Sequence, residues 1–263
     1  MKKIILLLFV FLATFSLFSR DFDYRDIPVQ DGGRIKPLDS FARNQLLSIY
    51  GKRSLKLENI SAIDWLIDLL ADPHNGFNQK VFKLRNPEVV QSLGLEWDNI
   101  HTYTYHEILD GLENQKELLI QIHAKSDDEL SIIESQLKEL HVNFQKFANM
   151  WWHLKIIPPA SDNPEDAWIS PWEVESEHAL SDNQRNLLFN FLEYLNKRLS
   201  DDTLGMDEAM TNYYIELNDN YSILVDSHRL KLETWYNQAN MFYMSLAFYI
   251  LAFLLLGFSW ITA

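Results

Sequence analysis

The chain has 263 residues, a formal net charge of −14 and 47% hydrophobic residues, which suits one large or two small folded domains and excludes a disordered or fibrous chain. Its 37 acidic side chains outnumber 23 basic ones, so nucleic acid is not an expected partner, because a phosphate backbone would be repelled. Cysteine is absent, which excludes disulfides, cysteine zinc sites and thioether attachment of haem to this chain.

The first segment has the pattern of an export signal. Lys2 and Lys3 precede an unbroken apolar run over residues 4–18, which is short for a full membrane span. We interpret residues 1–19 as a signal peptide or a short N-terminal anchor. Because the two lysines hold the N-terminus inside the cell, we expect residues 20–238 to form one mainly helical domain outside the cytoplasm, with little sheet.

A turn-rich segment opens this domain and leads into its first helix. Gly32 and Gly33 allow backbone angles that other residues avoid, which predicts a turn. Asp39 or Ser40 is expected to cap a helix that Gly51 ends. The cap residue types and the closing glycine together give this helix its expected limits.

Short elements are expected next along the chain. Ser61 and Asp64 form a capping-box pattern ahead of an apolar helix, and Pro73 is expected to end that helix. Residues 81–84 are the best strand candidate. A short helical unit over residues 86–94 follows, with an asparagine cap, a proline at the first helical position and a closing glycine.

The clearest periodic signal lies between Ser126 and Trp151, where apolar residues alternate spacings of three and four. This pattern predicts one long amphipathic helix, with Ser126 and Glu129 as its capping box. The apolar stripe has two interpretations: an internal core seam, or a surface for a partner helix. The stripe consists of Leu130, Ile133, Leu137, Leu140, Phe144, Phe147 and Trp151.

The C-terminal part is expected to be helical throughout. Ser181 is expected to cap one helix, and Asp207 to begin a last stretch that continues into the membrane. Residues 239–263 are expected to form one transmembrane helix, because about 23 residues from Met241 onward carry no charge and give about 34 Å of helix. No positive residue follows it, so we expect the front part of a longer or split membrane protein.

Signals for catalysis and metal binding are weak. The eight histidines include no i, i+4 pair that places two ligands on one helical face, so each is interpreted as structural or exposed and no metal site is expected. A nucleophile elbow and a phosphate-binding glycine loop are missing. We therefore predict no catalytic residue, and a hidden hydrolase site is the least favoured function.

Trp151, Trp152 and His153 are candidates for a haem contact. They combine flat aromatic surface with an imidazole that could ligate iron. The preferred interpretation is structural, because Trp151 completes the apolar stripe and belongs in the core. No cofactor is therefore assigned to this chain itself.

A second candidate cluster lies in the opening segment. Arg34, Lys36 and Arg43 could pair with an external carboxylate, such as a haem propionate or a partner's acidic side chain. The preferred interpretation is a turn fixed by glycine and proline, with the cations held by internal hydrogen bonds. The candidate motif residues are Gln30, Gly32, Gly33, Arg34, Lys36, Pro37, Asp39 and Arg43.

This segment carries a resemblance to a known family. Residues 28–43, which read Pro-Val-Gln-Asp-Gly-Gly-Arg-Ile-Lys-Pro-Leu-Asp-Ser-Phe-Ala-Arg, resemble the extracytoplasmic region of CcsA-type and fused CcsBA-type cytochrome c biogenesis proteins. Residues 81–95 look like the next block of that region, and residues 156–159 with 168–172 look like a later one. Residues 233–240 are similar to the approach to the family's membrane core.

The resemblance implies the System II pathway, in which a membrane complex exports haem and attaches it to apocytochromes outside the cytoplasm. The family's Trp-rich haem-handling loop and membrane histidines have no counterpart in this sequence, and residues 151–153 lack the glycine and aspartate of that loop. We therefore expect a front-end or accessory part of a cytochrome c synthase in the bacterial inner membrane, with haem implied only for the complex.

The expected partners are the remaining CcsA-type membrane core, a ResB/CcsB-type subunit and apocytochrome c. A membrane-tethered periplasmic interaction module unrelated to haem is the alternative. It would use the stripe between Leu130 and Trp151 as its contact surface.

Overall fold

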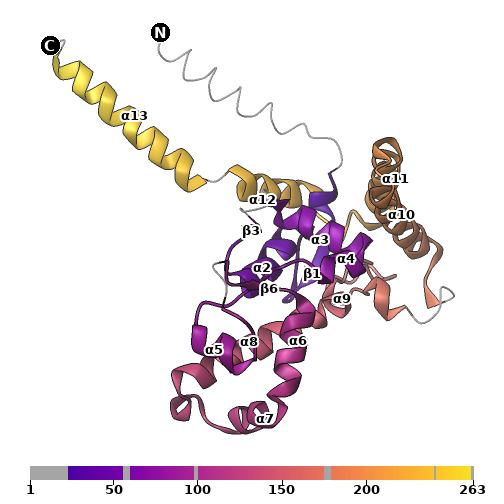
Figure 1. Cartoon of the computed structure of the whole chain (residues 1–263). Coiled ribbons are helices and arrows are strands. Elements are labelled where there is room, and N and C mark those ends of the chain that lie inside the picture. The colour runs from indigo at the N-terminus through magenta and orange to yellow at the C-terminus, as the bar shows by residue number, and fades with distance from the viewer. Residues whose placement is uncertain (1–22, 56–59, 98–99, 175–178, 240, 262–263) are drawn as a thin grey trace.

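The computed structural model is mainly helical, as the sequence predicts, and its sheet is limited in the described ranges to short antiparallel strand pairs (Figure 1). The structure describes residues 23–55, 60–97, 100–174, 179–239 and 241–261. The expected signal at residues 1–19 lies outside these ranges.

The elements follow one another in this order. The helices are α2 (Leu38–Tyr50), α3 (Ala62–Ala71), α4 (Pro73–Phe77), α5 (Pro87–Ser92), α6 (Tyr105–Asn114), α7 (Lys116–Ala124), α8 (Ile132–Ala148), α9 (Met150–His153), α10 (Asp182–Leu199), α11 (Thr203–Tyr221), α12 (Ser227–Ala239) and α13 (Met241–Ile261). The 3-10 turns are η2 (Tyr24–Asp26), η3 (Asp127–Glu129) and η4 (Pro171–Glu173). The strands are β1 (Pro28–Asp31), β2 (Arg34–Pro37), β3 (Ser54–Leu55), β4 (Ile60–Ser61), β5 (Phe82–Lys83) and β6 (Thr102–Tyr103), paired β1 with β2, β3 with β4 and β5 with β6.

β1 and β2 form a hairpin, and its turn lies at the glycine pair, where a turn is predicted. Asp31 pairs with Arg34 across the turn. Gly32 and Gly33 occupy the turn with φ angles of +61° and +77°. A two-residue hairpin turn with positive φ at both central positions matches the strand twist and suits glycine. The hairpin therefore leads β2 directly into α2.

α2 is the central helix of the core and contacts α3, α8, α12 and the hairpin. Its expected cap is wrong: the helix begins at Leu38 with Pro37 as the N-cap residue, and neither Asp39 nor Ser40 makes a capping bond. Pro37 has the extended backbone conformation of the residue that precedes a helix. The side chains of Asp39 and Ser40 bond to other partners. Gly51, at φ +73°, ends the helix as predicted.

The short elements between residues 60 and 95 agree with the sequence. Ser61 caps α3 by accepting the backbone N–H of Asp64, and Pro73 begins α4 two residues after α3 ends. The strand expected over 81–84 is reduced to β5. Asn86 caps α5, whose first residue is a proline.

The long helix expected from Ser126 to Trp151 is broken, which corrects the prediction. The capping box formed by Ser126 and Glu129 caps only the short 3-10 turn η3. α8 begins after Ser131, which forms a second capping box with Glu134. Because this second box satisfies the first backbone N–H groups of α8, the helix begins there.

The apolar stripe of α8 lies in the core. Leu137, Phe144 and Phe147 are buried. The ring of Phe147 packs edge-on against Phe82 at a centroid distance of 5.2 Å and stacks on Trp65 at 6.1 Å. The core-seam interpretation is therefore confirmed, and the stripe is not an open surface for a partner.

α10 and α11 form a helical hairpin at one side of the molecule (Figure 1). Ser181 caps α10 in a box with Gln184, as predicted. The last stretch does not begin at Asp207, because Asp202 already caps α11 by accepting a backbone N–H of its first turn. α11 and α12 are also separate helices, since residues 222–226 lie between them.

α13 carries the apolar C-terminal segment and projects away from the rest of the structure (Figure 1). Its large side chains are exposed, among them Phe242, Phe248 and Phe253. No single helix of the described ranges meets the length and apolarity needed to cross a membrane, but α12 and residues 241–257 meet them together, with a bend of 59° at their break. The single span expected over 239–263 stays a prediction.

Candidate functional site

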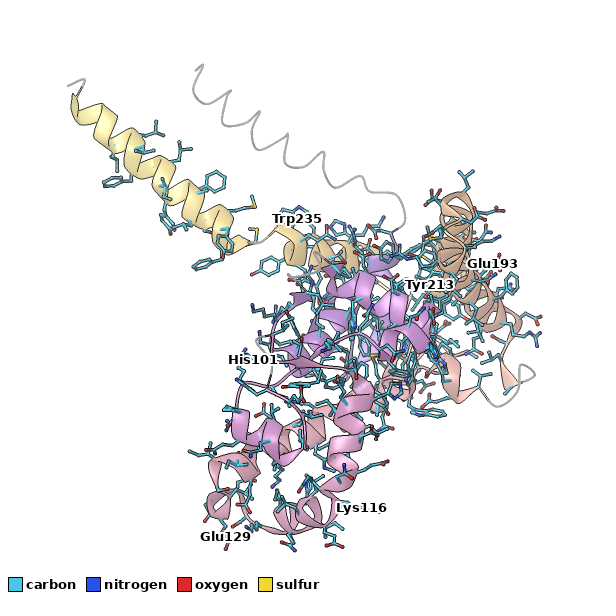
Figure 2. The ribbon with its side chains drawn as sticks, in the orientation of Figure 1. His101, Lys116, Glu129, Glu193, Tyr213 and Trp235 are labelled. Atoms are coloured by element: carbon cyan, nitrogen blue, oxygen red, sulfur yellow. The ribbon has the colours of Figure 1, made fainter. Side chains whose placement is uncertain are left out.

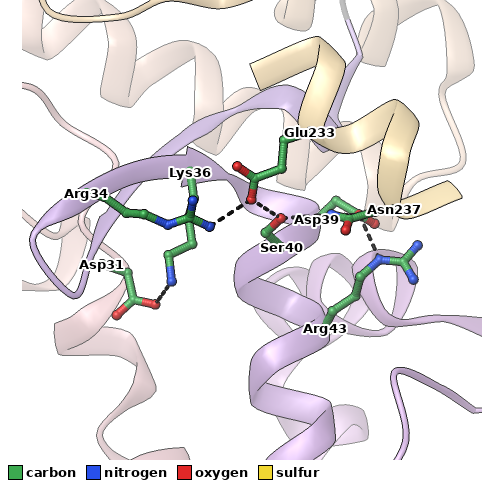
Figure 3. Close-up of polar contacts among 8 residues, drawn as sticks. All are labelled: Asp31, Arg34, Lys36, Asp39, Ser40, Arg43, Glu233 and Asn237. Atoms are coloured by element: carbon green, nitrogen blue, oxygen red, sulfur yellow. Dashed lines mark hydrogen bonds and ion pairs between the residues drawn. The ribbon is translucent and has the colours of Figure 1, made fainter. Parts of the chain in front are cut away.

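The candidate motif meets α12 at the base of α13, and we call this contact the α12 junction (Figure 3). It joins the β1–β2 hairpin and the first turns of α2 to a helix almost two hundred positions later in the chain. The α12 junction consists of Arg34, Asp39, Ser40, Arg43, Glu233 and Asn237.

Glu233 of α12 has two partners from the motif. One of its carboxylate oxygens lies 3.0 Å from a guanidinium nitrogen of Arg34 and accepts a hydrogen bond of 2.6 Å from the hydroxyl of Ser40. The Arg34 side chain is 55% exposed and that of Glu233 is 23% exposed. Charge-assisted hydrogen bonds of this kind fix the orientation of the Glu233 carboxylate, although solvent weakens its ion pair with the exposed Arg34.

Asp39 lies deeper, with 1% of its side chain exposed. One carboxylate oxygen accepts from Nε of Arg43 at 2.7 Å and from the side-chain amide of Asn237 at 3.1 Å. That amide also donates to the Ser40 hydroxyl at 2.8 Å. A buried carboxylate is stable only with such donors, so Asn237 ties α12 to the start of α2.

The hairpin end of the motif has its own polar contacts. Lys36 is buried and its ammonium pairs with the carboxylate of Asp31 (Figure 3). Gly32 and Gly33 form the exposed tip. All three motif cations thus have a carboxylate partner within the chain, as the preferred interpretation of Arg34, Lys36 and Arg43 expects.

Gln30 connects the hairpin to the loop after α9. Its side-chain oxygen accepts from the backbone N–H of Trp168 at 2.9 Å, and its side-chain nitrogen donates to the carbonyl of Asp166 at 3.3 Å. Its backbone N–H donates to the carbonyl of Lys155 at 2.9 Å. Ile157 and Ile169 bridge the two sides of this loop. The loop that contains residues 156–159 and 168–172 is therefore held against the hairpin.

A small hollow opens beside the α12 junction. Its volume is about 270 Å³ and its lining includes Gln30, Arg34, Pro164, Asp226 and Arg229. Two guanidinium groups and one carboxylate give it a net positive lining in an otherwise acidic chain. Such a hollow suits an acidic side chain, because guanidinium groups bind carboxylates with two hydrogen bonds.

The three haem-contact candidates all lie on α9, but their side chains have different surroundings. Trp151 is partly buried and packs on Trp172 at a centroid distance of 5.2 Å and on Phe77 at 6.1 Å. Trp152 is 50% exposed and His153 is exposed. Trp151 is thus a packing residue.

The sequence alone did not predict the contacts of Ser40, Glu233 and Asn237, although residues 233–240 are one of the blocks that resemble the CcsA-type family. A polar Glu-x-x-x-Asn pair at one-turn spacing just ahead of an apolar helix was the available signal, because side chains four apart share a helical face. No protein-family model matches the chain, and no curated protein sequence matches it.

Proposed function

We propose that this chain is the extracytoplasmic front-end part of a System II cytochrome c biogenesis complex, which positions a CcsA-type membrane core and does not attach haem alone. One observation carries the proposal: residues 28–43 and 233–240, two of the blocks in which the sequence resembles that family, meet at the α12 junction. The block at 168–172 joins them through the hydrogen bond from the Trp168 backbone N–H to Gln30.

The exposed apolar surface of α13 supports membrane anchoring. Soluble proteins rarely leave a continuous apolar surface of this kind exposed. A helix satisfies its backbone hydrogen bonds internally, so lipid can cover such a segment without cost to the backbone. We take residues 239–263 as the anchor, with the domain before it on the extracytoplasmic side.

The position of the α12 junction suggests what the domain does there. Its contacts fix α12, the helix that precedes the anchor in the chain, against α2. The hollow beside Arg34 is available to an acidic group of the membrane core or of a ResB-type subunit. Haem handling is left to those partners in this proposal.

The first test is genetic and biochemical. Deletion of the encoding segment is expected to abolish c-type cytochromes, measured by haem staining of membrane proteins, and the wild-type segment is expected to restore them. Full cytochrome maturation in the deletion strain would overturn the proposal.

Charge reversal at the α12 junction sharpens this test. Arg34→Glu and Glu233→Arg each place two like charges together and are expected to reduce maturation, whereas the two changes combined restore the ion pair. The matched control is Arg185→Glu, which alters a more exposed ion pair with Asp182 on α10. Equal loss in the double variant and the single variants would argue against a functional junction.

Topology is tested separately with a reporter. Alkaline phosphatase fused after residue 238 is expected to be active, because that enzyme folds only outside the cytoplasm. A reporter active only in the cytosol would overturn both the anchoring and the proposed role. The haem-independent alternative predicts an extracytoplasmic reporter together with normal cytochromes in the deletion strain.

A further inference from the structure

Two histidines from different helices face each other at the end of the molecule far from α13 (Figure 1). Nε2 of His123 on α7 lies 2.8 Å from Nδ1 of His141 on α8. The ring centroids are 5.0 Å apart and the ring planes are inclined by 67°. The two nitrogens therefore face each other across one hydrogen bond between the helices.

The remaining nitrogen of His141 has its own partner. The side-chain amide of Gln145, one turn later on α8, lies 3.1 Å from Nε2 of His141. As placed, the amide nitrogen of Gln145 donates to Nε2 of His141, so Nδ1 carries the proton that His123 accepts. A bound ion would replace that proton, and with its amide rotated Gln145 would accept Nε2–H, as the second partner of a metal-binding histidine commonly does.

The pair lies at the edge of an apolar hollow of about 600 Å³ between α6, α7 and α8. Its apolar walls include Leu112, Leu119 and Phe144, and its charged groups are Glu113 and Lys116. Lys116, at the start of α7, is labelled at this end of the molecule in Figure 2.

We propose that His123 and His141 form a two-imidazole binding site for a divalent copper or zinc ion. Imidazole suits these ions, whereas magnesium and calcium prefer oxygen ligands. Bonds of about 2.0–2.1 Å place two cis nitrogens about 2.9 Å apart around a square-planar ion and about 3.4 Å apart around a tetrahedral one. The two rings therefore need to separate by about 0.1–0.6 Å and to tilt, so that both nitrogen lone pairs turn from each other toward the ion.

The site has two protein ligands in this structure. Within the described ranges, no group of three or more His, Asp or Glu residues is placed to hold one ion. Water fills the remaining coordination positions. A bound ion connects α7 to α8 by two coordinate bonds and replaces the present hydrogen bond between the rings. This inference does not depend on the proposed role in cytochrome c biogenesis.

The test is metal titration of the full-length chain, purified in detergent without a histidine tag and stripped of metal with a chelator. Isothermal titration calorimetry with Cu²⁺ and with Zn²⁺ is expected to show one equivalent bound, with no signal for Mg²⁺. The electron paramagnetic resonance spectrum of the Cu²⁺ form is expected to show nitrogen hyperfine structure from two imidazoles.

Variants give the deciding result. His123→Ala and His141→Ala are each expected to weaken binding at least tenfold, and Gln145→Ala by about tenfold through loss of ring orientation. The control is His153→Ala, an exposed histidine on α9, which is expected to bind as the wild type does. Circular dichroism checks that each variant is folded. Absence of stoichiometric Cu²⁺ and Zn²⁺ binding, or binding that survives in the folded His123→Ala/His141→Ala double variant, would overturn the proposal.

Discussion

The side-chain amide of Asn237 donates to the same carboxylate oxygen of Asp39 that Nε of Arg43 contacts, at 3.1 Å and 2.7 Å. The second carboxylate oxygen of Asp39 has no hydrogen-bond partner among the described residues. The charge of this buried group therefore depends on one cation and one amide, which makes the α12 junction sensitive to change at either donor.

We expect Arg43→Met to lower the free energy of unfolding by about 3 kcal/mol, because the change leaves a buried carboxylate without its cation. Arg34→Met is the matched control. Arg34 is more than half exposed, so its ion pair with Glu233 contributes about 1 kcal/mol or less. Urea unfolding of the full chain in detergent, followed by circular dichroism, measures both. Equal losses for the two variants would contradict this ranking.

Adjacent buried tyrosines on α11 give a second prediction. The Tyr214 hydroxyl donates to the carbonyl of Asp23 at 2.9 Å, whereas the Tyr213 hydroxyl is buried with no partner among the described residues. We expect Tyr214→Phe to lower the free energy of unfolding by about 1 kcal/mol and Tyr213→Phe to leave it unchanged or raise it by up to about 1 kcal/mol. A larger loss for Tyr213→Phe, in the same urea measurement, would show that its hydroxyl has a hidden partner.

Alkaline pH is expected to destabilise the fold through tyrosine ionisation. Burial, together with the hydrogen bond to Asp64, raises the pKa of Tyr24 to about 12, and burial also raises the pKa of Tyr213 and Tyr214. Because unfolding returns these groups to a pKa of about 10, their contribution is full below pH 10 and is lost as pH rises toward 12. Urea midpoints between pH 8 and pH 11.5 measure this loss, and Tyr24→Phe is expected to reduce its slope.

Gln30 is expected to hold the loop that follows α9. Gln30→Leu removes two side-chain hydrogen bonds and leaves the backbone N–H of Trp168 without its acceptor, at a cost of about 1–3 kcal/mol. A glutamate-specific protease is therefore expected to cleave after Glu165 faster than in the wild type. Gln121→Leu, on an exposed face of α7, is the control, and equal cleavage rates in both variants would contradict the role of Gln30.

Local signals allowed much of the fold to be predicted. Ser61, Asn86 and Ser181 each cap the helix that the sequence assigns to them, because a cap depends only on residues within one turn. The glycine pair of the hairpin is equally local. Where two signals compete within a few residues, as Ser126 and Ser131 do, the sequence does not show which one starts the helix.

The candidate site was predicted only in part, for a physical reason. The motif residues from Gln30 to Arg43 were identified, but their partners on α12 come from a segment 193 or more residues later. The contact between His123 and His141 likewise spans two helices. Periodicity within one helix carries no information about which helices pack together, so such pairs appear only in three dimensions.

The long separation between Ser40 and Glu233 also affects how the chain is made. The hairpin and α2 leave the ribosome early, whereas Glu233 and Asn237 are the last polar partners to be synthesised before α13. At about 5–20 residues per second, roughly 10–40 s pass between the two events. During that interval Asp39 lacks one of its donors, so the polar contacts between the hairpin, α2 and α12 are complete only after α12 has been synthesised.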